Sequence, residues 1–158
     1  MGNNACFEFQ TRMLEKGVEV LLQQIGRFDE IVFKIKVAAM TVWVAVVGWA
    51  LTVRHEGLLL LGFVVIGGFW LLEGFFRGVQ LRYILRAEDT ARLLNDRERL
   101  EKSFTALEFP ADVIFAVSFR ETGLKKLGLY SKGMITPSVA IPYLLFAGIN
   151  CLVLISRL

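Results

Sequence analysis

Three long apolar stretches dominate the pattern of this chain, at residues 37–53, 57–76 and 134–156. A helix needs roughly 20 apolar residues to cross about 30 Å of hydrocarbon, with a lower limit of about 17. The second and third stretches have that length, and the first lies near the limit. We therefore predict an all-α integral membrane protein with three transmembrane helices. Residues 54–57 alone join the first two spans, which predicts a tight helical hairpin.

The segment before the first span carries an apolar seam whose members alternate at spacings of four and three residues. They are Leu14, Val18, Leu21, Ile25, Phe28, Val32 and Ile35. This a/d pattern is typical of a helix packed along a narrow stripe against another helix. The alternative is a helix lying on the membrane surface, which usually has a wider apolar face and a cationic polar face. No breaker separates the seam from the first span, so one continuous helix is expected to end near Arg54.

The charged segment after the second span predicts another long helix, which Pro110 ends because proline cannot continue the hydrogen-bond ladder. This helix would leave the membrane where the seam helix enters. The two would then pack antiparallel as a cytoplasmic helical stalk, formed by extensions of the first two spans. Residues 111–119 are apolar but too short to span. They form a short helix or strand on the stalk, or they dip into the membrane interface.

We accordingly expect five segments: a cytoplasmic heptad-patterned helix, a transmembrane hairpin, a cytoplasmic charged helix, a cytoplasmic interfacial segment and a third transmembrane helix. Their bounds are 1–36, 37–76, 77–109, 110–133 and 134–158. The interfacial segment alternates lysine with leucine and tyrosine. Lys125, Lys126 and Lys132 therefore suit the layer of anionic lipid headgroups.

The distribution of basic residues predicts the orientation. Of the 18 lysines and arginines, sixteen precede the first span or lie between the second and third. Arg54 and Arg157 are the other two. Cytoplasmic loops of membrane proteins carry such an excess. The N-terminus is therefore expected in the cytoplasm and the C-terminus outside, in a multi-pass protein of the bacterial inner (plasma) membrane.

Composition excludes several classes of function. A formal net charge of +3, spread over mixed-sign helical faces, gives no basis for a nucleic-acid partner. Cys6 and Cys151 would lie on opposite sides of the membrane, so neither a disulfide nor a metal site is expected. No nucleophile elbow, phosphate loop or dinucleotide-binding glycine pattern occurs in the sequence. We therefore expect no enzymatic activity and no cofactor.

Two polar residues within the spans are candidates for a functional site. Glu73 is the only acidic residue in an apolar stretch, and a buried carboxylate costs several kcal/mol unless it is paired, protonated or hydrated. It either lines a pore or pairs with Arg77 one helical turn away at headgroup depth. Asn150 either bonds across helices and fixes an oligomer, or faces headgroups in the outer leaflet.

Small residues in the first two spans predict close helix packing. They are Thr41, Ala45, Gly48, Gly67 and Gly68. Such faces favour assembly of several copies, so a homo-oligomer in the lipid bilayer is expected.

Three stretches of the sequence have the layout of a heptad-like helix, a two-span hairpin and a charged cytoplasmic helix. They are residues 27–36 (RFDEIVFKIK), 70–86 (WLLEGFFRGVQLRYILR) and 93–96 (LLND). In this layout the chain resembles small bacterial multi-span membrane proteins of phage-defence and abortive-infection loci. The resemblance implies a protein that oligomerises and perturbs the membrane when a cytoplasmic partner signals infection.

Two functions remain open at this point. The first is an oligomeric membrane-perturbing or channel-forming effector, controlled through its cytoplasmic helices. The second is a non-conducting anchor, scaffold or accessory subunit that recruits a cytoplasmic partner protein.

Overall fold

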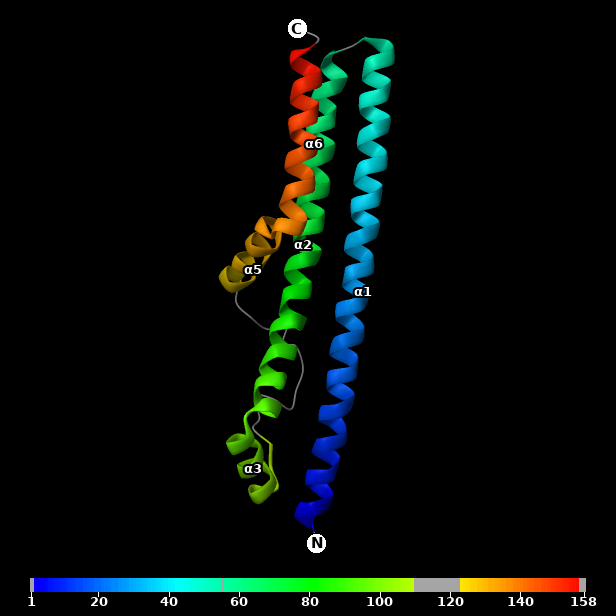
Figure 1. The fold of residues 1–158 in the computed structure, drawn as a ribbon. Coiled ribbons are helices and arrows are strands. Elements are labelled where there is room, and N and C mark those ends of the chain that lie inside the picture. The colour runs from blue at the N-terminus through cyan, green and yellow to red at the C-terminus, as the bar shows by residue number, and fades with distance from the viewer. Residues whose placement is uncertain (1, 55, 110–122, 157–158) are drawn as a thin grey trace. The chain divides into compact units, whose positions relative to one another are not determined.

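The computed structural model describes residues 2–54, 56–109 and 123–156, and the side chains of 5–54, 57–109 and 128–156. These residues contain five helices and no strand (Figure 1). The helices are α1 (Gly2–Val53), α2 (Glu56–Asn95), α3 (Arg97–Ala106), α5 (Gly123–Ile135) and α6 (Pro137–Ile155). Three of them, α1, α2 and α6, are long and apolar enough to cross a membrane. The predicted all-α fold with three candidate spans is therefore confirmed.

The described chain divides into two compact units. One comprises residues 28–79 and 123–158 and is called the apolar unit here. The other comprises residues 1–27 and 80–122 and is called the charged unit. Each is described by itself below.

In the apolar unit, α1, α2 and α6 pack around a core of apolar side chains. Its buried members are Ala39, Trp43, Val47, Ala50, Leu59, Ile66, Val139 and Tyr143. The predicted continuous first helix is confirmed, since α1 runs to Val53 without a break. Helix α2 begins at Glu56, so the predicted tight connection is confirmed as well. Arg54 ends α1 with a φ of 57°, in the left-handed region that closes many helices.

The third span begins with Pro137 in the first turn of α6, where the missing N–H of proline would have no helical partner anyway. Thr136 separates α6 from α5, and Figure 1 shows α5 turning away from the direction of α6. Pro142 lies inside α6. Because proline has no N–H, one backbone hydrogen bond is missing from the first turns of this helix.

The charged unit has a small core of its own around Phe7, Leu14, Leu93 and Phe109. Phe7 stacks on Phe109 with ring centroids 5.0 Å apart. The fully buried Gln80 side chain donates a hydrogen bond from Nε2 to the carbonyl oxygen of Ile25, at 3.1 Å. Four seam residues fall in this unit, and their side chains are buried or half-buried: Leu14, Val18, Leu21 and Ile25.

The single charged helix expected after the second span is interrupted. Helix α2 ends at Asn95, and Asp96 starts α3 as its N-cap, accepting a hydrogen bond from the Arg99 amide at 3.2 Å. Helix α3 also ends before Pro110. Leu107 adopts a φ of 52°, and its N–H bonds to the Ser103 carbonyl. An aspartate cap and a left-handed C-cap therefore set these boundaries. The expectation for residues 111–119 lies outside the described residues.

Candidate functional site

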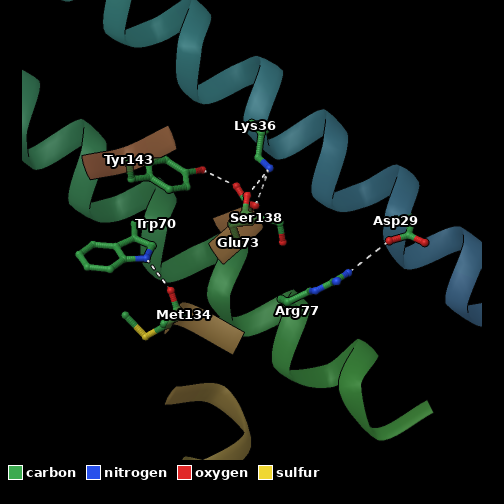
Figure 2. A network of polar contacts seen from close by, with 8 residues as sticks. All are labelled: Asp29, Lys36, Trp70, Glu73, Arg77, Met134, Ser138 and Tyr143. Atoms are coloured by element: carbon green, nitrogen blue, oxygen red, sulfur yellow. Dashed lines mark hydrogen bonds and ion pairs between the residues drawn. The ribbon is translucent and has the colours of Figure 1, made fainter. Parts of the chain in front are cut away.

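Glu73 lies at the centre of a polar cluster that joins α1, α2 and α6 (Figure 2). Its side chain on α2 is 0% exposed. One carboxylate oxygen, Oε1, is 3.2 Å from Nζ of Lys36 on α1. The other, Oε2, accepts a hydrogen bond of 2.8 Å from the Tyr143 hydroxyl on α6. We call Lys36, Glu73 and Tyr143 the three-helix node.

Lys36 also bonds directly to the backbone of α6. Its Nζ donates to the carbonyl oxygen of Ser138 at 2.8 Å. In a regular helix this carbonyl would accept from the amide of residue 142, but Pro142 has no N–H. The internal proline therefore leaves the Ser138 carbonyl with an open acceptor, and the lysine of another helix fills it. Pro142 was the available signal in the sequence, because a proline inside a helix frees the carbonyl four residues earlier.

A second backbone carbonyl is used in the same way where α5 ends. Trp70 on α2 donates from its indole Nε1 to the carbonyl oxygen of Met134 at 3.1 Å. Met134 lies in the last turn of α5, where carbonyl groups lack partners within the helix. Trp70 and Glu73 lie on the same side of α2, because they are three residues apart.

Arg77 does not form the ion pair with Glu73 that sequence analysis considered. Its Nη1 lies 3.3 Å from Oδ1 of Asp29 on α1. Asp29 and Lys36 are two helical turns apart on α1, so two α1–α2 ion pairs form at successive levels. Glu73 and Arg77 on α2 each have a partner of opposite charge on α1. The buried carboxylate of Glu73 therefore has a cationic partner within its own chain.

Asn150 makes a second polar contact farther along α6. Its side chain is 0% exposed and donates from Nδ2 to the carbonyl oxygen of Leu59 on α2, at 2.9 Å. The amide packs against Gly62, where an added Cβ would lie 3.0 Å from Asn150 Oδ1. Tyr143 and Asn150 are two turns apart and project from the same face of α6. The α6 helix is thus held to α2 at two levels, through Tyr143 and through Asn150.

Three glycines form a close crossing between α2 and α5 that sequence analysis did not identify. A Cβ at Gly78 would lie 2.8 Å from Cα of Tyr130, and one at Gly133 would lie 2.5 Å from the carbonyl oxygen of Gly74. Backbones can approach this closely only where side chains are absent. The spacing of Gly74 and Gly78, four residues apart on one face of a predicted helix, was the available signal.

The small residues that were predicted to pack closely do not pack against another helix within the described part of the chain. Thr41, Ala45, Gly48 and Gly68 are exposed, and Gly67 is half-buried. A Cβ added at any of the three glycines would meet nothing within 4 Å. The core of the apolar unit instead uses the opposite face of α1. A role of the small residues in contacts between copies stays a prediction.

The seven seam residues all have buried or half-buried side chains, with Leu14 8% and Val32 9% exposed. Lys132 is exposed, whereas the side chains of Lys125 and Lys126 lie outside the described part. Cys6 and Cys151 are both free and exposed. Among the described residues, no group of three or more His, Cys, Asp or Glu side chains is arranged to hold a metal ion.

The charged unit contains an apolar cavity of about 440 Å³. It is lined by Thr11, Leu14, Glu15, Val18, Leu94, Leu100, Phe104 and Phe109. Leu94 and Phe104 are about half exposed, at 46% and 53%, so the cavity opens to the surface.

No protein-family model, curated protein or solved structure matches the chain. The resemblance to membrane proteins of phage-defence loci therefore rests on the sequence pattern alone.

Proposed function

We propose that the protein is an oligomeric membrane protein of the defence type, which perturbs the bilayer or forms a channel under the control of its cytoplasmic helices. The observation that carries this proposal is the outward position of the small-residue face of α1. Thr41, Ala45 and Gly48 are exposed while the opposite face of the same helix fills the core. In hydrocarbon, small residues favour association because they let a second helix approach closely.

The spans also leave most of their surface uncovered. In the most apolar window of each candidate span, 22%, 28% and 17% of residues are buried inside the chain for α1, α2 and α6. The remaining faces meet lipid or other copies. This extent of free surface supports an assembly in which each copy contributes a pre-formed three-helix element.

The proposed topology follows the basic residues. We place the N-terminus in the cytoplasm, the C-terminus outside and the charged unit in the cytoplasm as a helical stalk, in the inner membrane of a bacterium. The burial of the seam residues and the Gln80–Ile25 hydrogen bond support a helix-packed stalk.

In this proposal Glu73 and Asn150 hold each copy together. Both are fully buried and bonded to neighbouring helices of their own chain. Any conducting path would therefore run between copies rather than past these side chains. A pore lined by Glu73 would first require the three-helix node to open.

Disulfide trapping tests the assembly. In a background with Cys6→Ser and Cys151→Ser, we expect Ala45→Cys to give cross-linked dimers in membranes. The matched control is Ala39→Cys, because Ala39 is 2% exposed and faces the core of its own chain. Equal cross-linking of both variants, or of neither, would contradict assembly through this face.

Flux of a dye or of ions from liposomes tests the activity. We expect release that rises more steeply than linearly with the ratio of protein to lipid, because assembly precedes conduction. A bilayer that stays tight at every ratio would refute the effector function and leave the non-conducting alternative.

That alternative is an anchor, scaffold or accessory subunit, and the cavity of the charged unit favours it. A partly open apolar cavity could receive an apolar side chain of a cytoplasmic partner. Leu94→Glu should then abolish co-purification of the partner, whereas Leu22→Glu should not. Leu22 is 59% exposed in the same unit and does not line the cavity. Retention of the partner by both variants would argue against the cavity.

A further inference from the structure

Helix α5 is the element of the apolar unit that the three-helix node does not include. It has 13 residues and ends at Ile135, so that Thr136 alone separates it from the third candidate span. Figure 1 shows it directed away from the path of α6. A helix that directly precedes a span and turns from its direction has its C-terminal end at the boundary of the hydrocarbon. It is therefore placed to run along the membrane interface.

The close crossing with α2 fixes the orientation of α5. Gly133 lies against the backbone of Gly74 and Gly78, and the indole of Trp70 bonds the Met134 carbonyl. The Tyr130 ring stacks on Phe75 with centroids 4.9 Å apart. These contacts leave α5 little freedom to rotate, so the outward side chains of its C-terminal half have a defined direction.

The outward side chains combine cationic and apolar character without acidic partners. Lys132 and Ser131 are exposed, and Ile135 is 72% exposed. Residues 123–158 contain three lysines and one arginine but no aspartate or glutamate. The acids of this unit whose side chains are described already have partners: Asp29 pairs with Arg77, Glu30 with Lys34 and Glu73 with Lys36. The charge of Lys132 is therefore complementary to an anionic surface outside the chain.

We propose that α5 is an interfacial helix that binds the headgroups of anionic phospholipids, with Lys132 in contact with phosphate and Ile135 in the acyl region. This inference deepens the proposed function, on whose membrane topology it rests, by naming the lipid class that acts on the protein. Ser138, which accepts the hydrogen bond from Lys36, follows Ile135 by three residues. Binding of α5 to lipid thus holds the start of α6 at the three-helix node.

The depth of α5 in vesicles tests the proposal without requiring assembly or flux. A fluorescent label is attached at Ser131→Cys in the Cys6→Ser, Cys151→Ser full-length protein. Quenching by a water-soluble agent and by a headgroup-linked nitroxide is then compared in phosphatidylcholine vesicles, with and without phosphatidylglycerol. We expect phosphatidylglycerol to lower the quenching by the water-soluble agent and to raise the quenching by the headgroup-linked nitroxide.

The effect should depend on Lys132. One lysine near an anionic surface contributes an equilibrium factor of about fivefold, so Lys132→Gln should lower the ratio of lipid-seated to unseated protein by about that factor. Lys132→Arg should restore it. The matched control is Lys102→Gln, since Lys102 is an exposed lysine of α3 whose partner Glu98 lies in the same helix.

Equal quenching in both kinds of vesicle would overturn the proposal, and so would an equal loss of the lipid effect with Lys102→Gln. Failure of the proposed function is distinguishable from these results. Absence of cross-linking or flux together with a phosphatidylglycerol-dependent label depth would refute assembly and retain the lipid-binding helix.

Discussion

Replacement of Lys36 by methionine should destabilise the protein more than replacement of Glu73 by glutamine. Lys36→Met keeps the length of the side chain and removes the charge that faces the carboxylate. Glu73 would then be left fully buried without its cationic partner, and would keep the hydrogen bond from the Tyr143 hydroxyl. Removal of one partner of a buried ion pair costs about 3–5 kcal/mol. We expect Lys36→Met to lower the free energy of unfolding by about 3 kcal/mol, at the lower end of that range.

The reverse substitution is expected to cost less because the two partners differ in exposure. The Lys36 side chain is 31% exposed, whereas that of Glu73 is 0% exposed. In Glu73→Gln the lysine can extend its ammonium group toward the headgroups and still donate to the Ser138 carbonyl. The glutamine can also accept from Tyr143. We expect a loss of about 1–2 kcal/mol, similar to that of an intramembrane hydrogen bond.

A double-mutant cycle makes this reasoning quantitative. The free energy of unfolding is measured for the wild type, both single variants and Lys36→Met/Glu73→Gln by reversible denaturation in mixed micelles. The double variant should be more stable than Lys36→Met alone, because no uncompensated charge remains buried.

The matched control is Lys34→Met, two residues away on the same helix. Lys34 pairs with Glu30, and the two side chains are 71% and 64% exposed. Exposed pairs contribute about 0–1 kcal/mol, so this variant should stay close to the wild type. Additive effects in the cycle, or equal losses for Lys34→Met and Lys36→Met, would refute the assignment of the node as a buried tie between helices.

Three further substitutions test other parts of the structure. Gly78→Ala should lower the free energy of unfolding by about 1–3 kcal/mol, since its Cβ would meet the Tyr130 backbone; Gly67→Ala, in open space, should be neutral or stabilising. Similar values for the two alanines would contradict the close crossing. Asn150→Leu should lower the free energy of unfolding by about 0.6–1.7 kcal/mol, because the hydrogen bond to the Leu59 carbonyl is lost. The same denaturation measures this, and an unchanged stability would argue against that bond. Asp96→Ala should destabilise the start of α3 by about 1 kcal/mol, because it removes the acceptor of the Arg99 amide. Amide hydrogen exchange at Arg99 should then be faster. Unchanged exchange there would contradict the cap.

The boundaries of the elements were predictable where they depend on neighbouring residues alone. The three apolar stretches and the short connection at Arg54 are local properties, and the structure agrees with them. The break at Asp96 was missed although aspartate is a frequent helix cap. The surrounding residues are good helix formers, and the expectation of one long helix outweighed a single capping signal.

The partners within the candidate site were much less predictable. Sequence spacing offered Arg77 as the partner of Glu73, because residues four apart face the same side of a helix. The observed partners, Lys36 and Tyr143, are distant in sequence, and their approach depends on the register of three packed helices. The glycine crossing has the same origin. Gly74 and Gly78 gave a local motif, but only the path of α5 determines which backbone lies against them.

The sequence by itself thus determined that this chain is helical and that three of its helices can span a membrane. The length of an apolar stretch and the residues that end a helix are local features of the sequence. A segment that crosses hydrocarbon must also satisfy its backbone hydrogen bonds internally, which favours a helix. The tertiary structure decided the use of the polar residues. It placed Glu73 and Asn150 inside the chain and left the small face of α1 outside. The physical reason is that a buried polar group needs a hydrogen-bond or ion-pair partner. The packing of the helices decides which side chain or carbonyl group lies within reach of it.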